Sequence, residues 1–502
     1  MCGMGVSRIN VQPLVRFTRH TGVYLGGRFL SAAAAAAASS SDRFLWEQSD
    51  LPALRCARSR GSMASRPEIL LLLLVLAVAA ASPSLGQTIS CPPGCTCSRS
   101  KHLVSCHGEA LTSLPATLPD NTDMLVVRGS LLTGALTFPC WSHPLDYLEI
   151  ADNRAALRLA RDSFGNLPHL ALLHFSGNRV AAGLPAGLLA PLKRLRWADL
   201  SNNSLAELPG SLFAGASALG YLDLSNNAVA SLPPGIFEDL GNLDTLLLSG
   251  NNLTALPGTV FGSLRQLETL DLSYNRLGSI SRVHFAALSA LKDLRLNGNF
   301  IRAIDGAVFR PLASLESLSL AFNAISSVPS QAFDGLRNLT RLDLAHNNLS
   351  AVAQGLLCGV KNLEWLYLAN NSIQEITADI FVENAKLKGV RLEGNALQRL
   401  PEQLLQGLAS LEELYLNGNR ISELPDGLLA VNEMGVKVPV FLDLSHNELS
   451  AVPQGITRAL VERMFILILH DNPLCGAPVQ GSGKDHVKKA CKLGTSGGTA
   501  RP

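Results

Sequence analysis

Four closely spaced cysteines offer the clearest chemistry in this sequence. They occur in CPPGCTCSRSKHLVSC as Cys91, Cys95, Cys97 and Cys106, with the spacing C-x3-C-x-C-x8-C. Cysteines this close together can bind zinc, but zinc sites usually use C-x2-C pairs. In a chain exported to an oxidising compartment, the same residues form disulfides. We therefore predict a disulfide framework; four cysteines allow three pairings, and the spacing does not choose among them.

Export is predicted by residues 63–86, which have the three regions of a secretory signal peptide. Arg66 is followed by the apolar run Ile69–Ala81 and then by small residues. That run is shorter than the roughly 20 residues that span a bilayer. Cleavage fits after either Ala81 or Gly86. The C-terminal end, KLGTSGGTARP, has no hydrophobic tail for a lipid anchor, so we expect a freely secreted, extracellular product.

Residues 1–62 precede this signal, and we interpret them as a non-native upstream extension, with Met63 as the true start. The alternative is an organelle transit peptide, because the segment contains arginines and a Ser/Ala-rich run and has no acidic residue before Asp42. The cysteines downstream favour secretion over that alternative.

Other reactive motifs are weak in this sequence. GAPVQGSGKD resembles a phosphate-binding loop, but Pro478 replaces its first glycine and Asp485 replaces its Ser/Thr. No H-E-x-x-H motif, nucleophile elbow or paired-carboxylate constellation stands out. A formal charge of +2 argues against a nucleic-acid partner that depends on a basic surface. We predict no catalytic residue, no cofactor and no metal ligand.

A repeat dominates the rest of the chain. In LETLDLSYNRLGSISRVHFAALSALKDLRLNGNFI, residues 267–301, the pattern L-x-x-L-x-L-x-x-N-x-L returns after 24 residues. Alignment on the Asn gives fifteen units, with steps of 24 residues from Asn203 to Asn419 and last intervals of 28 and 25. The aligned positions are Ser130, Asn153, Asn178, Asn203, Asn227, Asn251, Asn275, Asn299, Asn323, Asn347, Asn371, Asn395, Asn419, Asn447 and Asn472.

Each unit predicts a short strand, a turn and a bulkier return segment. Leu270 and Leu272 alternate with polar residues, which is typical of a strand with one buried face. The Asn should turn the chain and form a buried ladder of hydrogen bonds. The later half supplies an inward Phe, such as Phe261. Because one unit cannot bury its own core, we predict an α/β solenoid, curved, with a parallel β-sheet on its concave face.

This unit resembles the 24-residue typical leucine-rich repeat of animal extracellular proteins, from about Cys91 to Cys491. The general likeness is to secreted members such as chondroadherin, the small leucine-rich proteoglycans and the large subunit of carboxypeptidase N. The resemblance implies an N-terminal cysteine cap over residues 87–123 with the pairs Cys91–Cys97 and Cys95–Cys106. It also implies a repeat array over residues 124–474.

The C-terminal end departs from the pattern of that family, whose caps usually carry four cysteines. Only Cys475 and Cys491 are present, so we expect one bridge in a reduced cap with a flexible tail, residues 475–502. Cys140 and Cys358 lie nine repeats apart, roughly 40 Å, which is too far for a disulfide between them. We expect Cys140 to be a buried small hydrophobe and Cys358, on the outer face, to be an idle thiol; the alternative is that Cys358 cross-links to a partner.

The concave face holds the candidate binding residues. Exposed Trp, Tyr and Arg on a rigid sheet suit protein recognition, because they bury a large area at a low entropy cost. The alternative interpretation is ordinary amphipathic surface. Four of the candidates, on three successive strands, could form one patch: Trp365, Tyr367, Arg391 and Tyr415. The full set of candidates is Trp197, Tyr221, Arg341, Trp365, Tyr367, Arg391 and Tyr415.

Five N-x-S/T sequons could carry glycans in a secreted chain. Glycans on Asn202 and Asn370 would lie near the turn edge and leave the concavity open, whereas the ladder asparagines should stay buried and bare. The sequons begin at Asn202, Asn252, Asn338, Asn348 and Asn370.

These features predict a secreted, non-enzymatic binding protein of the extracellular matrix or cell surface, with a protein ligand on its concave face. One alternative is a soluble innate-immune pattern-recognition protein, whose ligand would bear glycan or lipid. Another is a regulatory or scaffold subunit of a secreted enzyme.

Overall fold

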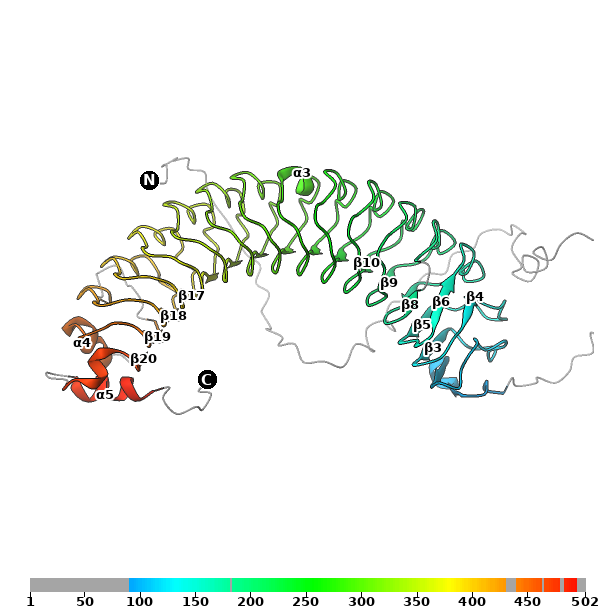
Figure 1. Ribbon diagram of the computed structural model, residues 1–502, viewed down its shortest axis with the longest axis horizontal. Helices are drawn as coiled ribbons and strands as arrows, with labels where there is room; N and C mark the ends of the chain where they lie inside the picture. Colours follow the sequence, from blue (N-terminus) through cyan, green and yellow to red (C-terminus); the bar gives the residue numbers. More distant parts are fainter. Residues whose placement is uncertain (1–89, 181–182, 430–438, 463–464, 479–482, 494–502) are drawn as a thin grey trace, which may run out of the picture. The chain divides into compact units, whose positions relative to one another are not determined.

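The computed structural model describes residues 90–180, 183–429, 439–462, 465–478 and 483–493. These residues form a curved solenoid in which short strands line the inner side of the arc (Figure 1). The predicted signal peptide (63–86) and upstream extension (1–62) lie outside the described residues. Among the described helices, none is both long enough and apolar enough to span a bilayer.

One sheet runs through the whole array. Its neighbouring strands pair in parallel, except that β1 and β2 pair antiparallel. The strands, in spatial order, are β1 (Cys95–Ser98), β2 (Leu103–His107), β3 (Met124–Arg128), β5 (Tyr147–Ala151), β7 (Leu172–His174), β9 (Trp197–Asp199), β10 (Tyr221–Asp223), β11 (Thr245–Leu247), β12 (Thr269–Asp271), β13 (Asp293–Arg295), β14 (Ser317–Ser319), β15 (Arg341–Asp343), β16 (Trp365–Tyr367), β17 (Gly389–Arg391), β18 (Glu413–Tyr415), β19 (Phe441–Asp443) and β20 (Ile466–Ile468).

The alternation within each strand confirms the predicted period of two. In β12 the central Leu270 is fully buried, and its cross-strand partners Leu246 and Leu294 are buried as well. The residues on either side of the central position face the concave surface. Because every step from β9 to β18 keeps the same register, equivalent residues form straight rows across the sheet.

The asparagine ladder joins each repeat to the one before it. The side-chain Oδ1 of Asn275 accepts a hydrogen bond from the backbone N–H of Leu253, at 3.1 Å. Its Nδ2 donates to the carbonyl oxygens of Leu248, at 2.9 Å, and Leu272, at 3.1 Å. The ladder side chains are buried or half-buried. Leaving one such group unpaired would cost about 1–3 kcal/mol, so the repeated Asn is a structural requirement.

A column of phenylalanines fills the space between the sheet and the return segments. Phe237 and Phe261 are fully buried, with ring centroids 6.2 Å apart. Equivalent neighbours further along the array stack at 6.1 and 6.2 Å. The return segments of the regular repeats are mostly turns; the helix α3 (Arg282–Phe285) occurs in one of them, and it includes one of these phenylalanines. The predicted inward Phe of the repeat is therefore confirmed.

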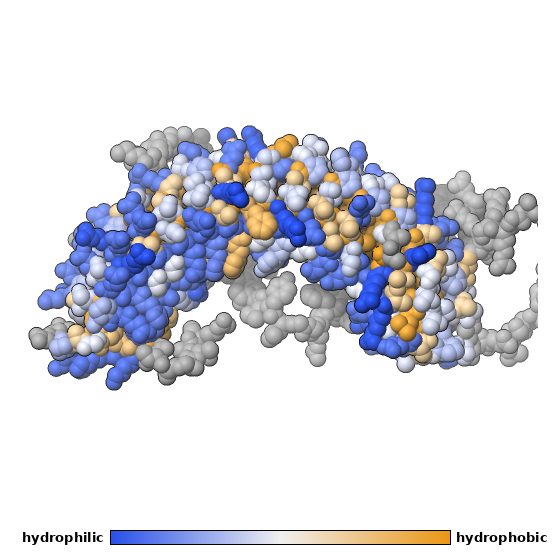
Figure 2. All heavy atoms as spheres, in the orientation of Figure 1, coloured by the Kyte–Doolittle hydropathy of each residue, from blue (hydrophilic) through white to orange (hydrophobic). Residues whose placement is uncertain are grey.

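The first repeats differ from the regular ones by a second, three-stranded parallel sheet. It consists of β4 (Gly134–Leu136), β6 (Ala156–Leu159) and β8 (Arg179–Val180), each placed shortly after a ladder position. Figure 2 shows apolar surface more often toward these N-terminal repeats, whereas the C-terminal part of the visible face is mostly hydrophilic.

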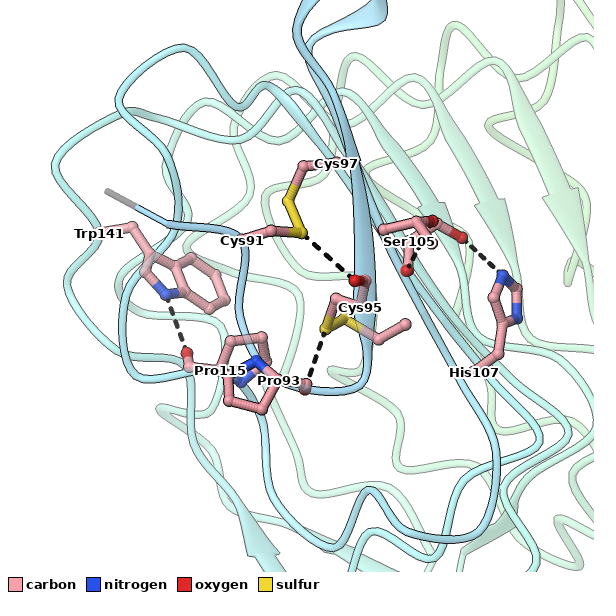
Figure 3. The surroundings of a disulfide bond; sticks show 10 residues. Cys91, Pro93, Cys95, Cys97, Ser105, His107, Pro115 and Trp141 are labelled. Atoms are coloured by element: carbon pink, nitrogen blue, oxygen red, sulfur yellow. Dashed lines mark hydrogen bonds between the residues drawn. A yellow bond between two sulfur atoms is a disulfide. The ribbon is translucent and has the colours of Figure 1, made fainter. Parts of the chain in front are cut away.

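Two disulfides close the N-terminal end, Cys91–Cys97 and Cys95–Cys106 (Figure 3). These are the pairs that the family resemblance implies. Cys95 and Cys106 lie directly opposite each other on the antiparallel strands β1 and β2, which brings their side chains together. A short 3-10 helix, η2 (Arg99–Lys101), lies between those two strands. Nearby, the indole N–H of Trp141 donates to the carbonyl oxygen of Pro115, at 3.2 Å.

The C-terminal end is covered by helices. The helix α4 (Gln454–Glu462) precedes β20, and α5 (Lys484–Lys492) follows the 3-10 helix η3 (Pro473–Gly476). A disulfide between Cys475 and Cys491 links η3 to α5. Val487 and Ala490 of α5 are buried against the last repeat. The carbonyl oxygen of Ala490 accepts a hydrogen bond from Leu469, at 3.1 Å.

Two expectations about single cysteines are wrong. Cys140 is exposed, because it lies in the irregular loop between β4 and β5, where Phe138 fills the buried position. Cys140 and Cys358 are both disulfide-bonded, so Cys358 is not an idle thiol.

Candidate ligand-binding face

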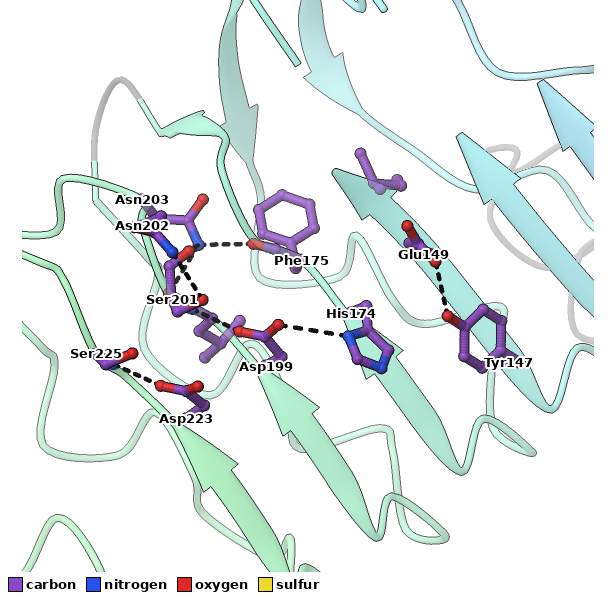
Figure 4. A network of polar contacts seen from close by, with 12 residues as sticks. Tyr147, Glu149, His174, Phe175, Asp199, Ser201, Asn202, Asn203, Asp223 and Ser225 are labelled. Carbon is purple, nitrogen blue, oxygen red and sulfur yellow. Dashed lines mark hydrogen bonds and ion pairs between the residues drawn. The ribbon is translucent and has the colours of Figure 1, made fainter. Parts of the chain in front are cut away.

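Aromatic side chains from neighbouring strands gather at two places on the concave face. The first, here called the N-terminal cluster, consists of half-buried residues on β5, β7, β9 and β10 (Figure 4 shows part of it). The indole of Trp197 stacks on the ring of Tyr221, with centroids 3.4 Å apart and planes at 4°. His174 lies 6.0 Å from that indole and 5.6 Å from the ring of Tyr147. The members of the cluster are Tyr147, His174, Trp197 and Tyr221.

Carboxylates lie beside these rings. Burial alone would raise the pKa of Glu149, but hydrogen bonds from Arg128 and Tyr147 outweigh it and lower that pKa. In the same way, burial would raise the pKa of Asp199, whereas hydrogen bonds from His174 and Ser201 lower it. Both carboxylates are therefore fixed as anions in the folded state.

Asp223 differs from these two carboxylates. Burial raises its pKa, because the hydrogen bonds from Ser225 do not compensate for the lost hydration. Burial also raises the pKa of the neighbouring Tyr221 hydroxyl, with a further contribution from Asp223. This side of the N-terminal cluster is thus rich in acceptors but poor in cations.

The second gathering, here called the C-terminal cluster, spans β15 to β19. The guanidinium of Arg391 lies 3.8 Å from the ring centroid of Tyr415, and that of Arg341 lies 4.6 Å from the ring of Tyr367. The ring of Tyr415 also lies 4.9 Å from that of Phe441. The members of the cluster are Arg341, Trp365, Tyr367, Arg391, Tyr415 and Phe441.

One glycine determines how Trp365 lies in this cluster. The indole of Trp365 covers Gly389 on the adjacent strand, in the space that a Cβ at that position would occupy. Gly389 is consequently buried although it belongs to the concave row. The absence of a side chain at residue 389 is what lets a large ring lie flat on the sheet.

Charges in the C-terminal cluster are mixed. The Arg391 guanidinium lies 3.7 Å from a carboxylate oxygen of Glu393 and 3.8 Å from one of Glu413. Burial nevertheless raises the pKa of Glu393. Burial also raises the pKa of Tyr367 and of Tyr415. Both phenols stay neutral at physiological pH and can donate hydrogen bonds.

Between the clusters the concave surface is polar. Arg295 forms an ion pair with Asp293, at 2.7 Å, and lies 3.7 Å from Asp271. An open depression is lined by residues of this region, including Ser317 and Phe322. The depression reaches Arg341 of the C-terminal cluster.

An exposed aromatic edge borders this region. Tyr274, Phe300 and Phe322 have exposed fractions of 63%, 60% and 53%. Tyr274 and Phe322 directly precede ladder asparagines and have left-handed backbones, with φ of 53° at each. The ring of Phe322 stacks on His346, with centroids 4.0 Å apart. Large apolar side chains that remain exposed in three successive repeats are typical of an interaction surface.

The structure thus brings the predicted residues together as two groups. Trp197 and Tyr221 stack in the N-terminal cluster, whereas the other five candidates belong to the C-terminal cluster. His174, Phe441 and the exposed edge were missed. His174 could have been found by aligning the repeats. It lies two residues after Leu172, and it occupies the same outward position as Asp199 in the next repeat.

The sequon asparagines lie on the surface of the array. Asn202 and Asn370 directly precede ladder asparagines at the turn edge, with left-handed φ of 56° and 53°. Asn252 is half-buried and the other four are exposed. A glycan at any of the four would point away from the buried ladder.

Comparisons with known proteins agree with this architecture. Residues 193–253, 242–301, 289–349 and 361–421 match the leucine-rich repeat family. Reticulon-4 receptor-like 2 of Homo sapiens is 34% identical over 127 residues, which cover 21% of this chain and 29% of that protein.

Solved structures show the same fold. The Toll–Spatzle complex, described as a molecular hub in Drosophila development and innate immunity, matches with a TM-score of 0.57 and 29% identity, over 65% of this chain and 44% of the matched chain. A leucine-rich repeat protein of Leptospira interrogans matches with a TM-score of 0.54 and 25% identity, over 75% of this chain and 91% of its own.

The chain spans less than half of the human relative and of the matched chain in the Toll–Spatzle complex. The sequence match, the parallel sheet and the asparagine ladder nevertheless agree on one fold. The described residues therefore have the fold of a leucine-rich repeat protein, and the segments between residues 193 and 421 named above match the model of that family.

Proposed function

We propose that this protein is a secreted, non-enzymatic binding protein that recognises a protein ligand of the extracellular matrix or cell surface through its concave face. The observation that carries the proposal is the C-terminal cluster, in which aromatic rings and two guanidinium groups lie on adjacent strands of a rigid sheet. Aromatic residues and arginine are the side chains most enriched at the energetic centres of protein interfaces.

The surroundings of the cluster support a protein partner. Its rings are already held by their neighbours, so little side-chain freedom is lost on binding. Ion pairs such as Arg391–Glu413 and Arg295–Asp293 offer polar contacts at the rim. The exposed edge formed by Tyr274, Phe300 and Phe322 extends the surface beyond the sheet.

Secretion is part of the same proposal. Its support is the signal-like segment that begins at Met63, the disulfides near both ends of the array and the exposed sequons. Disulfide-bonded caps persist in oxidising compartments and would be reduced in the cytosol. Glycans at Asn202, Asn338, Asn348 and Asn370 are proposed on the same grounds.

The test begins with expression from Met63 and identification of partners by cross-linking and mass spectrometry of the medium. The variant Trp365→Ser/Tyr367→Ser should fold normally, because both side chains face the concave surface, but should lose the partner. Val382→Ser, which removes a 56% exposed side chain from the outer half of a repeat, is the matched control. Equal capture by the wild type and the double variant would contradict the proposal.

The same experiment separates the two other functions predicted from the sequence. A ligand that bears glycan or lipid, lost in the double variant, would favour innate-immune recognition, and the Toll–Spatzle likeness is the observation behind this candidate. Co-purification of a hydrolase in fixed stoichiometry would favour a regulatory subunit. Either result would overturn a matrix or cell-surface protein as the partner.

A further inference from the structure

Two histidines and an aspartate meet at the turn edge of the last two repeats. His446 follows β19, and His470 and Asp471 follow β20. A carboxylate oxygen, Oδ2, of Asp471 lies 2.8 Å from Nδ1 of His470 and 3.4 Å from Nδ1 of His446. One ligand-type atom from each residue lies within 4.8 Å of the other two. Among the described residues, this is the one such group of three, and it belongs to neither aromatic cluster.

These distances fit a small metal ion. Zinc binds imidazole nitrogen and carboxylate oxygen at about 2.0–2.2 Å in tetrahedral geometry, which places the ligand atoms roughly 3.3 Å apart. Both distances from the Asp471 oxygen are within about 0.5 Å of that value. The two imidazoles are perpendicular, at 87°, with centroids 4.8 Å apart, so the distance between their ligand nitrogens must shorten by a rotation of the exposed His446 side chain when an ion binds.

We propose that His446, His470 and Asp471 form a binding site for a divalent transition-metal ion, with Zn²⁺ as the best match. Two neutral imidazoles and one carboxylate are ligands that zinc favours, whereas Ca²⁺ and Mg²⁺ require more oxygen ligands than this group supplies. Three protein ligands leave the fourth tetrahedral position open to solvent.

The backbone holds this group in place without the ion. The N–H of His446 donates to the carbonyl oxygen of His470, at 3.0 Å, which fixes one repeat against the next. His446 and Asp471 have left-handed φ of 52° and 56°, a conformation that residues other than glycine seldom adopt. The ladder side chains of Asn447 and Asn472, which follow directly, anchor these turns. Ligands on rigid neighbouring turns lose little freedom when an ion binds.

Sequence motifs do not reveal the site. His446 and His470 are separated by 24 residues, which is the length of a repeat and matches no local zinc-ligand spacing. The alternative reading of the geometry is that Asp471 only accepts hydrogen bonds from two imidazoles. That reading predicts no metal binding.

The probe is Zn²⁺ itself, titrated calorimetrically at pH 7.5 into the full protein without an affinity tag. We expect one ion per chain and a rise in Tm that follows the ion concentration. His446→Asn and Asp471→Asn are the test variants, because asparagine tolerates the left-handed conformation and the turns should therefore fold. Each should weaken binding at least tenfold and abolish the rise in Tm, and His470→Gln should do the same.

His143→Asn is the matched control, since it removes a half-buried histidine near the opposite end of the array. It should bind Zn²⁺ as the wild type does, and Ca²⁺ should give no signal with any variant. Circular dichroism checks that each variant is folded. The proposal fails if 100-fold excess Zn²⁺ produces no heat, or if the test variants bind as tightly as His143→Asn.

Discussion

The N-terminal and C-terminal clusters place aromatic rings on the same sheet in different ways. In the N-terminal cluster, rings stack on rings, as Trp197 does on Tyr221, and the charges beside this stacked pair are the carboxylates of Asp199 and Asp223. In the C-terminal cluster, guanidinium groups cover the rings, as Arg391 covers Tyr415. The repeat supplies the same rows of positions in both cases, so the difference comes from the residues that occupy them.

Their unpaired polar atoms differ as well. Among the described residues, the buried indole N–H of Trp197 has no hydrogen-bond partner, and neither has the buried Oε2 of Glu393. The first is a donor and the second is an acceptor.

The largest expected effect comes from adding a methyl group beneath the C-terminal cluster. Gly389→Ala places a Cβ where the Trp365 indole now lies, so the ring must move. Overpacking of this kind costs about 1–3 kcal/mol, and we expect a clear fall in Tm with a change in tryptophan fluorescence.

Gly220→Ala is the matched control at the N-terminal cluster. Its Cβ would meet the end of the flexible Asp244 side chain, at 3.3 Å, and no ring. Its Tm should stay close to that of the wild type. If both variants lose the same stability, the packing of Trp365 over Gly389 is not what distinguishes the clusters.

An intermediate effect should separate the two kinds of ring contact. A double-mutant cycle on Arg391 and Tyr415 should give a coupling of about 0.5–1 kcal/mol that weakens with added salt, because the attraction is electrostatic. A cycle on Trp197 and Tyr221 should give about 0.5–1.5 kcal/mol. Thermal unfolding at low and high ionic strength measures both, and a salt-dependent coupling in the second cycle would contradict the contrast.

The smallest effect is a difference in pH dependence. Folding lowers the pKa of Glu149. Its contribution to the stability of the folded protein is therefore present above its pKa in the unfolded state, about 4.3, and is lost as pH falls through its pKa in the folded state. The pKa of Glu393 is raised by burial, so its ionisation costs stability as pH rises from the unfolded value through the folded one.

Glu149→Gln should therefore lower Tm at pH 7, and Glu393→Gln should raise it, each by the equivalent of about 1 kcal/mol or less. Both differences should shrink toward zero well below pH 4. Thermal scans between pH 3 and pH 7 test the two signs. Effects of the same sign at pH 7 would show that the carboxylates of the two clusters do not differ in this way.

The sequence predicted those features that depend on the repeat alone. Leu270 inside, Asn275 in the ladder and Phe261 in the column follow from a period that each repeat shares with its neighbours. The repeat pattern does not predict how an aromatic ring on the concave face is oriented, because that orientation depends on residues one repeat away. Trp365 lies flat only because Gly389 is beneath it, and that pair is separated by 24 positions.

The irregular ends limited prediction further. Phe441 lies within the 28-residue interval from Asn419 to Asn447, so counting in steps of 24 does not place it next to Tyr415. Cys140 lies in a loop where the pattern is broken, and its exposure was missed for the same reason. His446 is equivalent to Asp471 rather than to His470, because the last interval, from Asn447 to Asn472, is 25 residues long.

The asparagine ladder has a mechanical consequence. Each ladder asparagine hydrogen-bonds its own turn to the preceding one. Tension applied at one end of the solenoid would therefore unfold the turns one after another from that end. Interior turns would stay folded until the adjacent turn had unfolded. The sulfur bridges sit at both extremities, where such unravelling would begin, and they act as stops against it.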